Sequence, residues 1–148
     1  MPAPDWIFSS FEELDSKLLY AMLGLRAEVF VVEQECAYQD LDGHDQDALH
    51  LCGLYDGELA CYARINAPGT KTRYTAISRV LVRKERRGKG LGRLLMLETL
   101  AHCERLWPGA PIGLSAQQYL VEFYASLGFR AVSNPYDEEG IPHVDMLR

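Results

Sequence analysis

The segment from residue 77 to residue 93 constrains the fold of this chain more than any other, because its character changes twice within a short distance. Residues 77–82 are rich in β-branched and apolar side chains and are typical of a buried strand. Residues 83–90 form a basic, glycine-containing turn, and an apolar helix begins at Leu91. A strand, turn and helix in this order bring free backbone N–H groups and the positive end of a helix dipole together. The segment therefore predicts a phosphate-binding site.

Two common phosphate-binding signatures do not fit this turn. A P-loop has Ser or Thr directly after Gly-Lys, whereas Gly88-Lys89 is followed by Gly90. A dinucleotide fingerprint needs a third glycine, and that position holds Arg93. The acidic residue expected on the next strand is missing too, since residues 112–118 contain no Asp or Glu. The pattern that remains is Arg-Gly-Lys-Gly-Leu-Gly at residues 87–92. The structural alternative is an ordinary strand–helix connection with solvated basic side chains.

Composition restricts the class of protein. With 148 residues, 48% hydrophobic and 24% charged, we expect one globular domain over residues 1–148. No apolar run is long enough to cross a membrane, and the first residues do not resemble a signal peptide. The four cysteines lack the spacing of a zinc site. We therefore expect free thiols, no metal, no membrane partner and a cytoplasmic location.

Charge is segregated along the chain, although the net charge is only −6. Residues 28–48 contain seven acidic residues and no Lys or Arg, whereas residues 71–93 contain nine basic residues and one acidic residue. A basic segment suits a polyanionic cofactor. The acidic segment either attracts a cationic substrate or is simply a solvated surface, and it argues against a nucleic-acid partner.

Hydrophobic periodicity predicts the element order β-α-β-β-β-α-β-α-β-β. The spacing of Ser10 and Glu13 predicts a capping box before the first helix, and Asp56-Gly57 predicts a two-residue hairpin that places Cys52 opposite Cys61 on one buried face. Such an order gives an α+β fold of three layers, with helices on both faces of a mixed, mostly antiparallel sheet. The predicted strands are 6–8, 49–55, 58–66, 74–82, 111–116, 129–133 and 141–147, the last two flanking a loop at 135–140, and the predicted helices are 14–29, 91–107 and 119–127.

This order, with a glycine-rich turn after the fourth strand, is similar to that of the GNAT acetyltransferases. Residues 87–92 resemble the loop with which these enzymes hold the pyrophosphate of acetyl-CoA. Residues 124–129 (Tyr-Ala-Ser-Leu-Gly-Phe) resemble the end of a second GNAT motif, in which Gln117 takes the place of the usual Asn and Leu120 that of Ala. Residues 25–43 and 140–146 look like the ElaA branch of the family, for which the acceptor is not settled.

The resemblance implies an acyltransferase that moves an acetyl group from acetyl-CoA to an amine by direct attack in a ternary complex. The alternative is a catalytically inactive GNAT-like domain that senses acyl-CoA. Tyr124 is expected to protonate the leaving thiolate, although its place on an apolar helix stripe also suits a packing role. The residues expected to bind the cofactor are Val80, Leu81, Val82, Arg87, Gly88, Lys89, Gly90, Leu91, Gly92, Arg93, Gln117 and Tyr124.

The incoming amine must lose a proton before it attacks, and a carboxylate or an imidazole can accept that proton. The candidates in the sequence are Glu33, Asp40, Asp42, His50 and His143. Of these, Glu33 and His143 are expected to be catalytic residues, together with Tyr124. The expected acceptor is a cationic small molecule or peptide that carries an amine, and a homodimer is left open.

Overall fold

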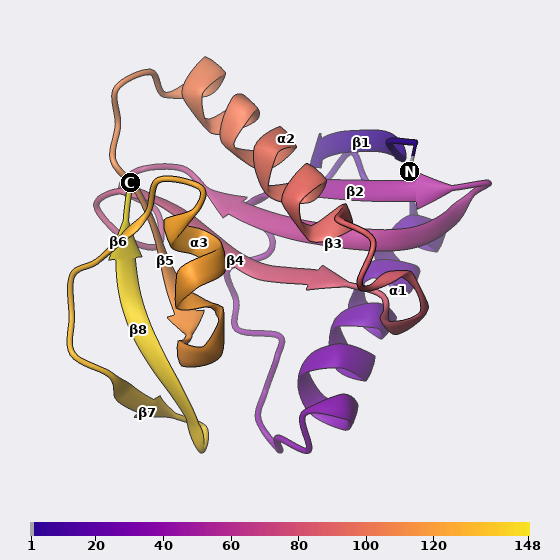
Figure 1. Cartoon of the computed structure of the whole chain (residues 1–148). Helices are drawn as coiled ribbons and strands as arrows, with labels where there is room; N and C mark the ends of the chain where they lie inside the picture. The colour runs from indigo at the N-terminus through magenta and orange to yellow at the C-terminus, as the bar shows by residue number, and fades with distance from the viewer. Residues whose placement is uncertain (1) are drawn as a thin grey trace.

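A single eight-stranded sheet forms the frame of the computed structural model, which describes residues 2–148 (Figure 1). Its strands lie in the order β1-β2-β3-β4-β5-β8-β6, and β7 pairs with β8. The strands are β1 (Asp5–Ser10), β2 (Leu49–Tyr55), β3 (Glu58–Asn66), β4 (Thr75–Val82), β5 (Ile112–Gln117), β6 (Arg130–Ala131), β7 (Tyr136–Glu138) and β8 (Ile141–Leu147). The helices are α1 (Ser16–Arg26), η1 (Ala27–Glu33), η2 (Lys84–Arg86), α2 (Leu91–Leu106), η3 (Gln118–Leu120) and α3 (Val121–Ala125).

The sheet is mixed and mostly antiparallel, as predicted. β4 and β5 form its parallel pair, and the other neighbouring strands run antiparallel. The connection between β4 and β5 passes through the basic turn and α2, which is the crossover that a parallel pair requires.

Helices pack on both faces of the sheet, but they cover different parts of it on each face. On one face, α2 and α3 pack on a core that includes Ile77, Leu114 and Met146. On the other face, α1 packs on β2, β3 and β4 through residues such as Met22 and Tyr62. Figure 1 shows α1 below the β2–β4 half of the sheet and away from β5 and β8. On this side, α1 therefore does not cover β5 and β8 (Figure 1).

The first helix begins later than the sequence pattern predicts. Glu13 does accept hydrogen bonds from the backbone N–H and the hydroxyl of Ser10, both at 3.0 Å. However, the residues between them form a turn, and the N-cap is Asp15, whose carboxylate accepts from the N–H of Leu18 at 2.7 Å. The predicted capping box is thus a local turn, and a single Asp cap starts α1. At its other end, α1 continues into the π-helix η1.

The predicted facing pair of Cys52 and Cys61 is wrong. The two-residue turn does pair Tyr55 with Glu58, but the register shifts between Gly53 and Leu54, because β3 has an extra residue, Ala60, between Leu59 and Cys61. Cys52 then faces Tyr62, and Cys61 faces Gly53. Because one extra residue turns every following side chain to the other face, the two cysteines belong to different core clusters on opposite faces of the sheet.

The C-terminal region contains one more strand and less helix than predicted, and the strand predicted at 129–133 is reduced to β6 at Arg130–Ala131. The segment predicted as a loop at residues 135–140 holds β7, which pairs with β8. The predicted helix at 119–127 is a 3-10 turn followed by the short α3. Gly128 follows it with φ of 96°, a conformation that glycine adopts without strain.

Candidate active site

A cleft opens in the sheet where β4 and β5 diverge. Their parallel ladder consists of the pairs Thr75–Ile112 and Ala76–Gly113, and the strands then separate (Figure 1). The cavity between them has a volume of about 1000 Å³. Beyond Ala76, the backbone N–H and C=O groups of β4 lose their β5 partners, so they can pair with an extended ligand instead.

β4 carries a bulge at the level of this cleft. Between the pairs Tyr62–Leu81 and Arg64–Ser78, two residues of β4 oppose one residue of β3. One of the two, Arg79, has φ of 55°, which is uncommon for a residue other than glycine. Since a bulge bends its strand and redirects side chains, it contributes to the separation of β4 from β5.

The basic turn forms one end of the cavity. Gly88 and Gly90 have φ of 78° and 84°, and Gly90 is the N-cap of α2, which no side chain caps. A Cβ placed on either glycine would meet no atom within 4 Å. The glycines are therefore required by their left-handed backbone and not by crowding. The open space above uncapped helical N–H groups fits a pyrophosphate.

Most of the predicted cofactor residues meet at this cavity. Lys89 is exposed and does not line it, and neither does Arg93, which donates to the hydroxyl of Ser126 at 3.3 Å. The side chain of Leu91 is buried in the core, so its backbone is the part available to a ligand. The lining residues among those predicted are Val80, Leu81, Val82, Arg87, Gly88, Gly90, Leu91, Gly92, Gln117 and Tyr124.

Tyr124 reaches the same cavity from α3. Its ring packs edge-on against Phe123 and Phe129, with centroid distances of 5.1 and 5.9 Å. The residue is 6% exposed, and burial raises the pKa of its phenol to about 12. The hydroxyl therefore stays protonated near neutral pH and remains a potential proton donor. Tyr124 thus packs in the hydrophobic core and also lines the cleft.

Glu33 lies at the end of η1 and lines the cavity, but its carboxylate has a partner. Its Oε2 lies 2.8 Å from Nη2 of Arg87, in the basic turn. The Nε of Arg87 also donates to the carbonyl of Val82 at 2.9 Å. Glu33 and the end of β4 therefore hold the arginine of the predicted pyrophosphate loop in one orientation.

His143 lies on β8, opposite Gln117. Its Nδ1 is 2.7 Å from the carbonyl oxygen of Ile141. A carbonyl can only accept a hydrogen bond, so Nδ1 carries the proton and Nε2 of the neutral ring is an acceptor. Nε2 is 3.6 Å from the carboxylate of Glu138. This imidazole, which lines the cavity, can accept a proton from a ligand there.

Two contacts join the N-terminal wall of the cavity to its C-terminal wall. The amide of Gln117 donates to the amide oxygen of Gln34 at 3.3 Å. The thiol of Cys36 donates to the carbonyl of Glu139, also at 3.3 Å. Gln117 is one of the residues that the family resemblance assigns to cofactor binding, and in this structure its amide is bonded to Gln34.

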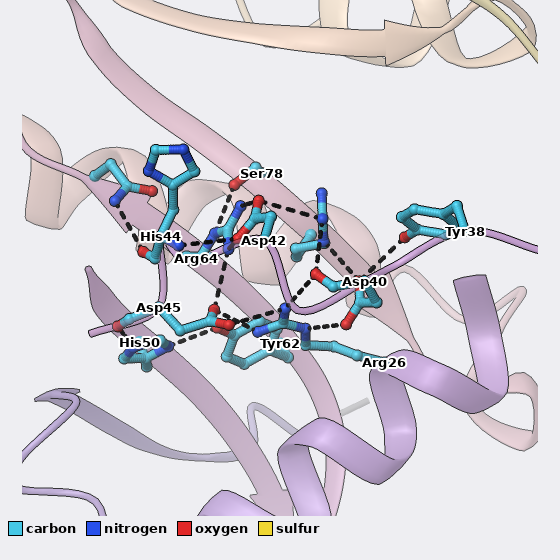
Figure 2. Close-up of polar contacts among 12 residues, drawn as sticks. Arg26, Tyr38, Asp40, Asp42, His44, Asp45, His50, Tyr62, Arg64 and Ser78 are labelled. Carbon is cyan, nitrogen blue, oxygen red and sulfur yellow. Dashed lines mark hydrogen bonds and ion pairs between the residues drawn. The ribbon is translucent and has the colours of Figure 1, made fainter. Parts of the chain in front are cut away.

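Three aspartates of the acidic segment, the buried Asp40 and Asp45 and the more exposed Asp42, are paired with arginines and do not present a free acidic surface (Figure 2). The guanidinium of Arg26 lies 2.8 Å from Asp40 and 2.6 Å from Asp45. Asp40 also pairs with Arg79 at 2.7 Å. Arg64 pairs with Asp42 and Asp45 at 2.8 and 3.0 Å. Neither Asp40 nor Asp42 is therefore free to act as a base.

The arginines keep these carboxylates charged. Burial by itself would raise the pKa of Asp42, but hydrogen bonds from Arg64 and the N–H of His44, together with the charge of Arg79, lower it well below its usual range. The pKa of Asp45 is lowered mainly by Arg26, again against the effect of burial. Paired buried charges of this kind stabilise one arrangement of the acidic segment across β3 and β4.

His50 is a core histidine and not a catalytic base. It is fully buried, with Nε2 2.9 Å from the carbonyl of Asp45 and Nδ1 2.6 Å from the hydroxyl of Tyr62. Nε2 therefore carries the proton and Nδ1 accepts from Tyr62. Burial lowers the pKa of His50, and the nearby Arg26 and Arg64 lower it further.

The sequence analysis missed a polar face on β5 and β8. Ser115 lies directly opposite Asp145, and both line the cavity next to Gln117 and His143. The signal was present as alternation: polar residues at 115 and 117, and at 143 and 145, are separated by the buried Ala116 and Val144. In a strand such alternation puts the polar side chains on one face.

Other kinds of site are not found in the part of the chain that the structure describes. Within residues 2–148, no group of three or more His, Cys, Asp or Glu side chains could hold a metal ion. None of the helices described combines the length and the hydropathy that a membrane crossing needs.

A sheet split between β4 and β5, with a glycine turn at the start of the following helix and a tyrosine in the cleft, defines the class of GNAT acyltransferases. Residues 17–148 match the family model of the acetyltransferase (GNAT) domain, and the chain belongs to this family. It is 44% identical to ElaA of Escherichia coli over 146 residues, which cover 97% of this chain and 95% of ElaA.

Solved structures agree with this assignment. An acyl-CoA N-acyltransferase from Pseudomonas aeruginosa is similar with a TM-score of 0.94 and 44% identity, over 99% of both chains. The crystal structure of E. coli ElaA is similar with a TM-score of 0.93 and 43% identity, over 98% of this chain and 99% of ElaA. The predicted resemblance to the ElaA branch is confirmed.

Proposed function

We propose that this protein transfers an acetyl group from acetyl-CoA to an amine, with both reactants bound at once. The observation that carries the proposal is the single cavity between β4 and β5. It has the Gly88–Gly90 turn at one end, and Tyr124 and His143 also line it. Holding both reactants in one cavity makes the reaction effectively unimolecular, which supplies much of the rate.

The chain offers a binding group for each part of the cofactor. The uncapped N-terminus of α2, next to the turn that Arg87 braces, suits the pyrophosphate. The unpaired edge of β4 beyond Ala76 suits the amides of the pantetheine arm. A backbone N–H of β4 near the bulge would also polarise the thioester carbonyl, an effect commonly worth about 3–4 kcal/mol.

We assign the two proton transfers to Tyr124 and His143. The amine nitrogen attacks the carbonyl carbon as the carbon–sulfur bond breaks, and the phenol of Tyr124 gives its proton to the departing thiolate. The Nε2 of His143 accepts the proton that the amine loses. The ion pair of Glu33 with Arg87 favours a role in loop geometry for Glu33 over the role of base.

The charges around the cavity favour one kind of acceptor. Carboxylates on the β7–β8 hairpin, among them Glu138 and Glu139, line the part of the cavity where we place the acceptor, and they favour a cationic amine. Buried free cysteines suit a reducing compartment such as the cytoplasm, where we place the protein.

The experiment that tests this proposal measures release of free CoA thiol from acetyl-CoA with a panel of amines, next to the thermal shift caused by CoA. Wild-type protein should release thiol in an amine-dependent manner. Tyr124→Phe should lower turnover by about 10²-fold, while the CoA-dependent shift is kept. A clear thermal shift without thiol release for any amine would instead indicate an acyl-CoA sensor.

A further inference from the structure

A chain of hydroxyl groups on one face of β5, β7 and β8 leads to one carboxylate. The hydroxyl of Tyr136 donates to Oδ1 of Asp145 at 2.6 Å. The hydroxyl of Ser115 contacts the same Tyr136 oxygen. Since the Tyr136 proton is used toward Asp145, Ser115 must donate to Tyr136. Both hydroxyl protons therefore point along the chain toward the carboxylate, which fixes its orientation.

The setting of Asp145 differs from that of the aspartates in the acidic segment. Asp40 and Asp45 are each paired with buried arginines, whereas the side chain of Asp145 is held by a neutral phenol. Its backbone is fixed as well, because its N–H donates to the hydroxyl of Ser133 at 2.9 Å. Asp145 is thus an oriented carboxylate that lines the cavity and is not paired with an arginine or lysine among the residues that the structure describes.

The spacing of Asp145 and His143 along β8 determines how far apart two ligand groups that contact them must be. The two residues are two apart on β8 and project from the same face, which corresponds to a separation of about 7 Å along the strand. Gln117 pairs with His143, and Ser115 pairs with Asp145. Consider a ligand whose reacting nitrogen lies beside His143 and whose chain extends along this face toward Asp145. A second polar group about 7 Å further along that ligand would contact Asp145.

The remaining charges near this wall favour a cation at that point. Glu138 and Glu139 lie on the same hairpin and line the cavity. Arg79 is already bound by Asp40 and Asp42. Lys71 is the opposing charge, but burial lowers its pKa, and so do the charges of Arg64 and Arg79.

We infer, building on the proposed acyltransferase function, that Asp145 binds a second cationic group of the acceptor, about 7 Å from the nitrogen that is acetylated. The acceptors are then diamines or longer polyamines. Asp145 is the residue that determines this specificity, and Tyr136 is a positioning residue that acts through it.

The test compares three acceptors that each have four carbon atoms and one primary amine to be acetylated: 1,4-diaminobutane, butylamine and 4-aminobutanoate. We expect kcat/KM to be at least about 10-fold higher for the diamine than for butylamine, because a hydrogen-bonded charge pair commonly contributes that much. The carboxylate compound should be the poorest. Asp145→Asn should bring the ratio of diamine to butylamine close to one. Tyr136→Phe should lower the ratio in part, through a higher KM for the diamine.

Asp47→Asn is the matched control, because it removes one exposed charge from the acidic segment, away from the cavity walls, and it should leave the ratio unchanged. Calorimetric binding of 1,4-diaminobutane to the CoA-loaded protein gives a readout without turnover. Binding that Asp145→Asn weakens supports the inference even if no thiol is released, in which case the proposed function fails alone. Equal kcat/KM for diamine and butylamine, preference for 4-aminobutanoate, or a ratio and an affinity that Asp145→Asn does not change would overturn the inference.

Discussion

Glu33 and Arg87 are 54 positions apart in the chain, yet their side chains form an ion pair of 2.8 Å between the end of η1 and the basic turn. The contact joins the N-terminal wall of the cleft to the loop that we assign to the pyrophosphate. It gives Glu33, which by sequence was a candidate for the base, a different task from that of His143.

Replacing each candidate base with Gln, which is neutral and does not accept a proton near neutral pH, should separate the two roles. We expect His143→Gln to lower kcat by about 10²-fold, because the proton acceptor is lost. Glu33→Gln should change kcat by less than about 10-fold and act mainly on the affinity for CoA, since it weakens only the brace on Arg87. Steady-state kinetics with acetyl-CoA varied at a saturating amine concentration measures both. A larger loss of kcat in the Glu33 variant would reverse the assignment.

Gly90 offers a test of the loop that does not depend on turnover. Its φ of 84° is strained for a β-branched residue, whereas Asn tolerates this region better. Gly90→Val should therefore abolish the thermal shift caused by CoA, and Gly90→Asn should keep a substantial part of it. Because a Cβ at this site meets no protein atom within 4 Å, both variants should fold. An undiminished shift in Gly90→Val would remove the turn from the binding site.

The cysteines should differ in reactivity. Burial raises the pKa of Cys52, Cys61 and Cys103 to about 12, so their thiolate forms are scarce. Cys36 lines the cleft. Alkylation of native protein without reductant, followed by mass spectrometry, should modify Cys36 first and the other three only after denaturation. A thiol pair missing after denaturation would show a disulfide, against the four free cysteines of the structure.

His50 should make the stability of the protein depend on pH. Its pKa is lowered in the folded state, while the unfolded chain has an ordinary histidine pKa of about 6.5. Below that pH the unfolded state binds more protons, so the free energy of unfolding falls as the pH drops, by at most about 1.4 kcal/mol per pH unit. Urea unfolding of wild type and His50→Gln between about pH 7 and pH 5 checks this. The slope should be smaller in the variant, and equal slopes would contradict the assignment.

Local patterns in the sequence determined much of the fold and the cofactor end of the site. The strand–turn–helix around Gly88 and Gly90 depends on backbone preferences and on helix-terminal N–H groups, which act between residues close in sequence. The same holds for the Asp56-Gly57 hairpin and for the order of the elements. A local pattern was misleading where two nearby residues could cap the same helix, as at the start of α1, where Asp15 is the cap and Ser10 is not.

Long-range contacts decided the rest. The acidic segment was compatible with a binding surface or a solvated one, but three of its aspartates meet Arg26, Arg64 and Arg79 from three separate elements. One bulge in β3, at Ala60, moved Cys61 to the other face. The oriented carboxylate of Asp145 exists because β5, β7 and β8 bring Ser115 and Tyr136 beside it. Side-chain pairing and register depend on which strands become neighbours, and a local pattern does not contain that information.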